Sequence, residues 1–161
     1  MVRMLKGSGV ETHVHIEAPP EVVYGVVSDV TRMGEWSPET VKCEWLDGAV
    51  GPAVGARFKG ANKRGIARWT TKPRVVVADP GREFAFDVDT DVRWTYRFEV
   101  DGTGTKLTES FEMLRDLRWY YAFFERHLMR VKDRRADLEH GMNVTLERIK
   151  RVVESEASTL N

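Results

Sequence analysis

The sequence predicts an α+β fold in which a curved antiparallel sheet of about seven strands wraps around a long C-terminal helix. Residues 10–17 and much of 41–113 alternate apolar and polar side chains, which is the period of half-buried strands. Two short helical segments lie between these two regions. Residues 125–154 instead place apolar side chains three and four positions apart, which is the period of an amphipathic helix.

The first strand is predicted over residues 10–17. Val10, Thr12, Val14 and Ile16 share one face of it, and charged or histidine side chains occupy the other face. This alternation indicates a strand with one face toward a core and one toward water.

Two short helices are predicted after this strand. Pro20 has no N–H to lose at the start of a helix, and valines gather on one side of the segment that ends at Val27. Thr31 is a suitable N-cap for the second helix, which ends near Trp36 because Ser37-Pro38 follows.

Six further strands are predicted, and short turns join them as in an antiparallel meander. Pro73 lies within the third of these strands and indicates a sheet edge or a bulge. The residues Asp101-Gly102-Thr103-Gly104 are typical of a hairpin turn. The six strands cover about residues 41–45, 56–62, 66–78, 84–88, 92–100 and 106–113.

The long helix is predicted over residues 125–154, which contain no proline. We expect residues 10–154 to form a single domain, with a flexible segment at 1–9 and a frayed tail at 155–161. The apolar stripe of the helix consists of Val131, Leu138, Met142, Thr145, Ile149 and Val152.

The composition predicts a globular protein without a charge-driven partner. Lys plus Arg and Asp plus Glu both number 25 among 161 residues, so no net field attracts nucleic acid or an anionic membrane. No apolar run approaches the roughly 20 residues that span a bilayer, so no transmembrane segment is expected. With one cysteine and no visible secretion signal, we expect a cytoplasmic protein.

No metal site and no cofactor are predicted. His13 and His15 are spaced to approach one metal ion, but no third ligand lies near them in the sequence, so we interpret both as solvated. The glycine-rich residues 48–55 lack the Lys-Ser/Thr pair of a phosphate-binding loop and are interpreted as a hairpin loop.

Several stretches of the sequence are informative together: the first strand with APPEVVY, the segment GEWSPE, the pair DPGREFAF and GTKLTESFE, and GMNVTLERIK in the last helix. They resemble the polyketide cyclase/dehydrase branch of the START-like (SRPBCC) superfamily. The resemblance covers residues 10–154 and implies a helix-grip fold with a deep cavity between sheet and helix. The superfamily contains lipid carriers, hormone-binding proteins and cyclases, and no catalytic motif of the family can be carried over residue by residue.

The inward faces of the strands carry many large rings. An ordinary aromatic core is one interpretation, and a ring-lined ligand cavity is the other, which the resemblance favours. The residues predicted to contact the ligand are Trp45, Phe58, Asn62, Trp69, Phe84, Phe86, Trp94, Tyr96, Phe98, Glu109, Phe111, Arg134, Leu138, Met142 and Thr145.

Glu109 is the residue that breaks the apolar pattern, because it shares the inward phase of the last strand. A carboxylate there must be protonated or paired. It is an ion-pair partner of Arg134 or Arg135, an anchor for a polar group of the ligand, or a residue that a bulge turns outward. For an enzyme, Glu109 and His127 are the candidate catalytic acid and base.

We expect the protein to bind a small hydrophobic metabolite, ring-containing or acyl, as a carrier or sensor, and we favour this over catalysis. The first alternative is a cyclase or dehydratase that acts on a polyketide-like or lipid-like substrate. The second is a protein-interaction module that uses the rings of residues 119–124. Those rings form a cavity entrance, a homodimer contact or a membrane contact, in that order of preference.

Overall fold

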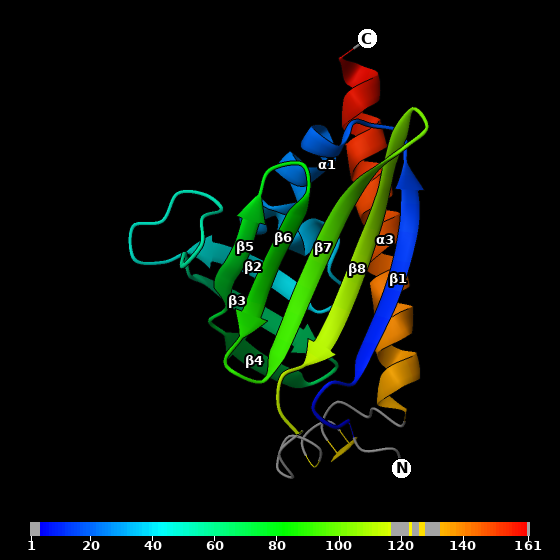
Figure 1. Cartoon of the computed structure of the whole chain (residues 1–161). Coiled ribbons are helices and arrows are strands. Elements are labelled where there is room, and N and C mark those ends of the chain that lie inside the picture. Colours follow the sequence, from blue (N-terminus) through cyan, green and yellow to red (C-terminus); the bar gives the residue numbers. More distant parts are fainter. Residues whose placement is uncertain (1–3, 117–122, 124–125, 128–132, 161) are drawn as a thin grey trace.

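The computed structural model describes residues 4–116, 123, 126–127 and 133–160. Two short helices follow the first strand, seven further strands follow them, and a long helix comes last (Figure 1). The strands are β1 (Gly9–Ile16), β2 (Thr40–Trp45), β3 (Phe58–Arg64), β4 (Ala67–Thr71), β5 (Arg74–Asp79), β6 (Glu83–Val88), β7 (Val92–Asp101) and β8 (Gly104–Met113). The helices are α1 (Pro20–Val27), the 3₁₀ helix η1 (Val30–Glu35) and α3 (Arg134–Thr159).

The strands form two antiparallel sheets that meet at a corner. One sheet has the order β1-β8-β7-β6-β5, and the other has the order β2-β3-β4. The sheets join where the Val75 N–H donates to the Ala56 carbonyl at 2.8 Å and the Phe58 N–H donates to the Pro73 carbonyl at 3.1 Å. The predicted meander is therefore present, and β1 extends it by pairing with β8.

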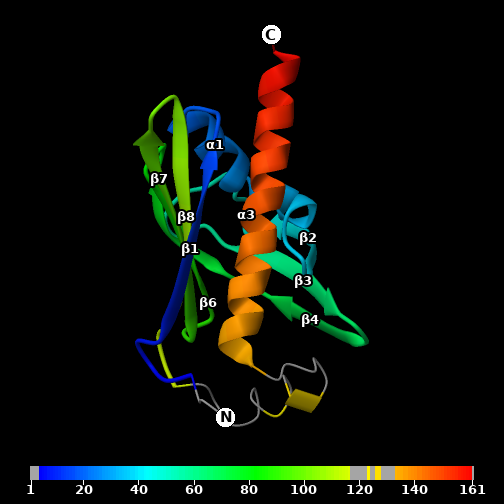
Figure 2. The same cartoon turned by 90° about the vertical axis from the view of Figure 1, so that its right-hand side faces the viewer.

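The helix α3 lies between the two sheets, as Figure 2 shows when the molecule is turned by 90°. The β1-β8-β7-β6 surface lies on one side of it and β2–β4 on the other. This arrangement confirms the predicted wrapping of a curved sheet around one long helix. None of the described helices is long and apolar enough to cross a membrane.

The structure differs from the prediction at Pro73, which divides the predicted strand 66–78 into β4 and β5. Proline cannot donate to a ladder, so the chain changes sheets at this point. The described residues consequently form eight strands where about seven were predicted.

The ends of the domain also differ from the prediction. Met4 is buried, and the Gly7 N–H donates to the Met113 carbonyl at 2.9 Å, so part of the segment predicted to be flexible is attached to β8. The helix α3 begins at Arg134, where the Asp133 side chain accepts from the Ala136 N–H, and it continues to Thr159. It therefore extends into the tail predicted to be frayed.

The main core lies between the large sheet and α3, in the part that α1 covers. Tyr24 of α1 packs edge-on against Phe98 and Phe84, with ring centroids 5.4 and 6.4 Å away. Leu146 and Ile149 of α3 are fully buried against this cluster. A second, smaller cluster lies nearer the start of α3 and consists of Met4, Val10, Phe111, Met113 and Met142.

Candidate ligand-binding cavity

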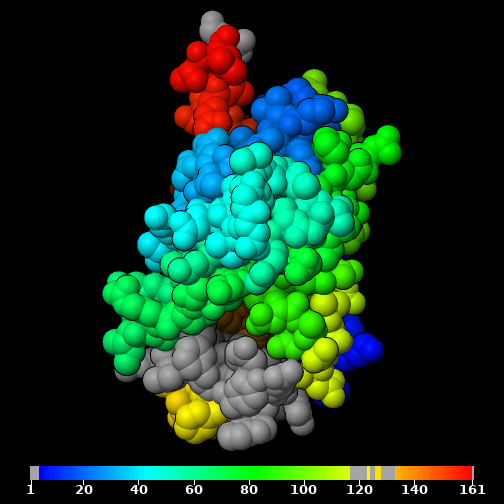
Figure 3. Space-filling view, turned by 90° about the vertical axis from the view of Figure 1, so that its left-hand side faces the viewer, coloured from blue at the N-terminus to red at the C-terminus, as the bar shows by residue number. Residues whose placement is uncertain are grey.

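A cavity of about 940 Å³ lies between the two sheets and the first half of α3. Its wall comes from η1, β2–β4, β6–β8 and the α3 residues from Arg134 to Thr145. In the space-filling view, the surface is hollowed between the β3–β4 hairpin and the β6–β7 turn (Figure 3). Drug-sized ligands occupy pockets of roughly 300–1,000 Å³, so the volume suits a small molecule.

The wall is mostly apolar and aromatic. Rings from both sheets contribute to it, and they pack on one another edge-on: Phe58 with Phe86 at 5.2 Å between centroids, and Trp94 with Phe111 at 5.0 Å. The predicted ligand residues on this wall are Phe58, Asn62, Trp69, Phe86, Trp94, Tyr96, Glu109, Phe111, Arg134, Leu138, Met142 and Thr145.

Three predicted ligand residues lie outside this wall. Phe84 and Phe98 point the same way as Phe86 and Tyr96, but they lie at the ends of their strands that α1 covers. Trp45 packs against Phe58, with ring centroids 5.8 Å apart, and lines a separate small pocket together with residues 50–52.

His127 does not line the cavity. Its side chain is exposed, and its ring lies 4.3 Å from that of Phe123 between centroids. The structure therefore does not bring His127 to Glu109 as the predicted acid–base pair requires. Phe123 is on the cavity wall although it is 58% exposed, and the rest of the predicted segment 119–124 lies outside the described residues.

Glu109 lies at the centre of the wall formed by the large sheet. It is only 3% exposed and is paired in register with Thr12 of β1 and Tyr96 of β7. The Tyr96 hydroxyl donates to Glu109 Oε1 at 2.9 Å, and Glu109 Oε2 has no hydrogen-bond partner among the described residues. Burial raises the pKa of Glu109 to about 8, and the hydrogen bond from Tyr96 opposes this only in part.

The predicted ion pair of Glu109 with Arg134 or Arg135 is absent from the described residues. Arg135 donates instead to the Gly9 carbonyl at 3.2 Å. The Arg134 guanidinium lies over the Phe111 ring, 5.7 Å from its centroid. Burial lowers the pKa of Arg134, and the opposing charges are those of Glu39 and Asp137. Glu109 is therefore held by a neutral hydroxyl and not by a cation.

A second polar group lies on the wall formed by the small sheet. The Thr40 hydroxyl donates to Asn62 Oδ1 at 2.9 Å, and Asn62 Nδ2 donates to the Gly60 carbonyl at 3.3 Å. Thr71 Oγ1 lies 3.4 Å from the same Asn62 nitrogen. These groups satisfy one another, so this wall offers polar atoms without an unpartnered charge.

An ion-pair network, which sequence reasoning missed, joins the small sheet to α3 beside the cavity. Arg64 Nη1 donates to Asp137 Oδ2 at 2.6 Å and to Glu39 Oε1 at 3.1 Å. Burial raises the pKa of Glu39 against the opposing effect of Arg64. No local spacing signals this contact, because Arg64 and Asp137 are far apart in the sequence.

Sequence reasoning also missed wall residues from the segment between α1 and β2. Met33 and Trp36 line the cavity, and Trp36 is almost completely buried. Cys43 lines it as well, and burial raises the pKa of its thiol to about 11, so it is a neutral wall residue. Among the described residues, no group of three His, Cys, Asp or Glu side chains is placed to hold a metal ion.

Comparisons with known proteins agree with this architecture. A polyketide-cyclase-like protein from Corynebacterium glutamicum is 39% identical over 96% of this chain and 96% of its own, with a TM-score of 0.64. Two more distant structures share the fold. An AHSA1-like protein from Aeromonas hydrophila is 20% identical over 93% of this chain and 94% of its own, with a TM-score of 0.63. Major latex-like protein 151 from Panax ginseng is 15% identical over 92% of this chain and 96% of its own, with a TM-score of 0.65. The search of curated proteins gave no match.

The family comparison covers the same part of the chain that forms the sheets, the cavity and α3. The model of the family described as polyketide cyclase/dehydrase and lipid transport matches residues 9–154. The sequence resemblance and the helix-grip architecture are thereby confirmed. The chain belongs to the polyketide cyclase/dehydrase and lipid transport family.

Proposed function

We propose that this protein binds a small hydrophobic metabolite, ring-containing or acyl, in the cavity between the sheets and α3, as a carrier or sensor. The observation that supports this most directly is a cavity of about 940 Å³ with a mostly apolar wall to which rings from both sheets contribute. A chain selected only for stability gains by filling such a space, since empty volume forfeits packing contacts. A bound apolar ligand supplies these contacts instead.

The wall also has the composition of a small-molecule site. Such sites combine a large apolar surface with a few polar groups that orient the ligand. Here the polar groups include Glu109 with Tyr96 on one wall and Asn62 with its threonine partners on the other. The printed description of the family includes lipid transport, which is consistent with a carrier.

The first test is to identify what the protein carries. Native mass spectrometry of the purified protein, followed by denaturing extraction, is expected to show a bound apolar molecule released on unfolding. In parallel, ethylnaphthalene is titrated against the tryptophan fluorescence, because Trp36, Trp69 and Trp94 lie on the wall. Saturable quenching is expected, and no response to any apolar probe would contradict the proposal.

A cavity-filling variant and a matched control locate the binding. Leu138 lies on the cavity wall, whereas Glu147 lies on the exposed face of the same helix. Leu138→Trp is expected to weaken ethylnaphthalene binding at least 10-fold by occupying the space, and Glu147→Trp is expected to leave it unchanged. Equal effects of the two variants would place the binding elsewhere.

An enzyme acting on a polyketide-like substrate is the second candidate. The observation that favours it is the buried Glu109 carboxyl group with one unpartnered oxygen on the cavity wall. A general acid or base contributes roughly 100-fold or more to turnover, so Glu109→Gln would reduce the conversion of a poly-β-keto thioester by that factor. If the protein is incubated with this thioester or with the extracted ligand and either molecule is recovered unchanged, the result supports the carrier function over the enzyme.

A further inference from the structure

One oxygen of the buried Glu109 carboxyl group has no hydrogen-bond partner among the described residues. Its Oε1 accepts from the Tyr96 hydroxyl at 2.9 Å, and its Oε2 is buried without a partner. Both residues line the cavity. A buried polar atom without a hydrogen bond is energetically costly, so such an atom on a residue that lines a cavity points to a ligand contact.

The surroundings of Glu109 favour its neutral form. Thr12 and Tyr96 flank it on the neighbouring strands. From α3, the charged or titratable side chains on the cavity wall are Arg134, Asp137 and His140. None of them forms a hydrogen bond or an ion pair with Glu109, and burial dominates the shift of its pKa to about 8. A neutral carboxyl group carries a proton that it can donate.

We infer that Glu109 donates a hydrogen bond from Oε2 to an uncharged oxygen acceptor of the ligand, and that the ligand class is therefore a neutral hydrophobic molecule with a ketone-like carbonyl group. This inference rests on the proposed ligand-binding function. With Oε1 occupied by Tyr96, Oε2 is the oxygen of this cavity-lining residue that has no hydrogen-bond partner among the described residues, so its O–H group is the donor left for a ligand.

The same geometry disfavours charged ligands. A carboxylate ligand brings a negative charge into a mostly apolar cavity, where Arg64 is already bonded to Asp137 and Glu39 and the Arg134 guanidinium lies over the Phe111 ring. An ammonium ligand would require Glu109 to ionise and would bury an ion pair, whose desolvation offsets most of the attraction. A carbonyl oxygen needs neither change.

Three probes with the same ring system test this preference. Acetylnaphthalene carries the carbonyl group, ethylnaphthalene has nearly the same shape without it, and naphthoate carries a charge. Isothermal titration calorimetry with the wild-type protein near pH 7 is expected to show acetylnaphthalene binding roughly 3- to 10-fold more tightly than ethylnaphthalene, the range of one neutral hydrogen bond. Naphthoate is expected to bind more weakly than either.

Two substitutions separate a neutral donor from an anion. Glu109→Gln keeps an oxygen for Tyr96 and an N–H donor for the ligand, so it is expected to retain the ketone preference. Glu109→Met keeps the approximate volume without the donor and is expected to bind the ketone and the hydrocarbon equally. Above pH 8 the wild type is expected to lose its preference because Glu109 ionises, whereas Glu109→Gln is expected to keep it.

The outcomes distinguish this inference from the proposed function. If ethylnaphthalene binds but the wild type does not prefer the ketone, or if naphthoate binds most tightly, the inference is wrong and the hydrophobic cavity stands. If Glu109→Gln loses the preference as completely as Glu109→Met does, the donor is not a neutral carboxyl group. If none of the three probes binds, the proposed function itself fails.

Discussion

The two halves of α3 face the same large sheet, yet one half is packed and the other borders a cavity. In the packed half, the Leu146, Ile149 and Val153 side chains are completely buried in the main core. From Arg134 to Thr145 it faces a space of about 940 Å³. The strands supply large rings along both halves, so ring content alone does not decide which half is filled.

The difference arises from where α1 lies. Tyr24 of α1 fills the space beside Phe84 and Phe98, and the cluster is completed by buried valines of the same helix. No corresponding helix covers the rings near Glu109 among the described residues. One short helix therefore makes Phe84 and Phe98 part of the core.

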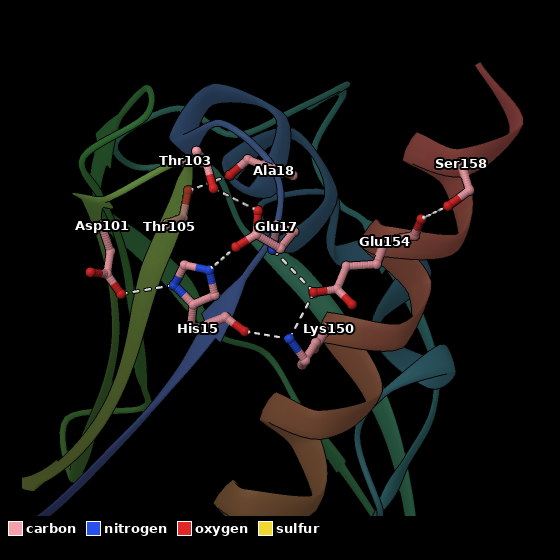
Figure 4. Close-up of polar contacts among 9 residues, drawn as sticks. All are labelled: His15, Glu17, Ala18, Asp101, Thr103, Thr105, Lys150, Glu154 and Ser158. Carbon is pink, nitrogen blue, oxygen red and sulfur yellow. Dashed lines mark hydrogen bonds and ion pairs between the residues drawn. The ribbon is translucent and has the colours of Figure 1, made fainter. Parts of the chain in front are cut away.

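Polar groups follow the same division. Beyond the packed half, His15, Glu17, Asp101, Lys150 and Glu154 form a connected network on the surface (Figure 4). Lys150 Nζ donates to the His15 carbonyl and to Glu154, each at 2.7 Å. Beside the cavity, in contrast, Glu109 Oε2 is buried and has no hydrogen-bond partner among the described residues.

The largest expected effect tests the packing of the two halves on one helix. Leu146→Ala is expected to destabilise the protein by roughly 2–5 kcal/mol, because it creates a cavity in a filled core. Leu138→Ala is expected to cost about 1 kcal/mol or less, because that side chain already borders empty space. Urea denaturation of both variants measures the difference, and equal costs would show that the cavity half is also packed.

The second effect concerns the pH dependence of stability. The pKa of Glu109 is raised from 4.5 in the unfolded chain to about 8 in the folded protein, so between these values the unfolded state releases a proton that the folded state retains. Stability from this group is therefore complete below about pH 4.5 and decreases as pH rises toward 8, with a limiting slope of about 1.4 kcal/mol per pH unit.

Glu109→Gln cannot ionise and is expected to escape this loss. Relative to the wild type, its free energy of unfolding is expected to rise by roughly 4 kcal/mol between about pH 4.5 and pH 8. Denaturation at several pH values gives the difference directly, and other titrating groups cancel in it. A constant difference across this range would mean that Glu109 is ionised throughout.

A third, smaller effect concerns the network that joins the small sheet to α3. Arg64 bonds to both Asp137 and Glu39, and all three side chains are partly exposed, so the Arg64–Asp137 pair is expected to contribute about 1 kcal/mol or less. A double-mutant cycle with Arg64→Met and Asp137→Asn measures that coupling. Faster hydrogen exchange in β3 and β4 of Arg64→Met is expected, with the packed half unchanged; equal changes in both halves would contradict a local role.

The sequence predicts the faces of the strands well, but not the depth at which each ring lies. Alternation correctly places Phe84 and Phe86 on one face, yet only the position of α1 decides that Phe84 is core and Phe86 is cavity wall. The Tyr96–Glu109 contact could have been predicted from the sequence, because counting back from the hairpin pair Asp101–Gly104 places these two residues opposite each other. The Arg64–Asp137 contact depends on how the helix crosses the small sheet and leaves no local pattern.

The smallest expected effect concerns His15, beyond the packed half. Its Nδ1 lies 2.8 Å from Asp101 Oδ2, and its Nε2 contacts Glu17 Oε1. A neutral imidazole can donate from only one nitrogen, so both contacts are satisfied only when the ring is protonated. The two carboxylates accordingly raise the pKa of His15, with the hydrogen bond to Glu17 as the largest cause.

Because the pKa of His15 is higher in the folded protein, its stabilising contribution is complete below the unfolded value of 6.5 and is lost as pH rises through the folded value. His15→Gln is therefore expected to lower the melting temperature slightly at about pH 5.5 and to have less effect at about pH 9. His13→Gln, on the same strand, is the matched control and should show no such trend. Since the ring is well exposed, added salt is expected to reduce the effect of the substitution. A larger effect in the presence of added salt would argue against an ionic origin.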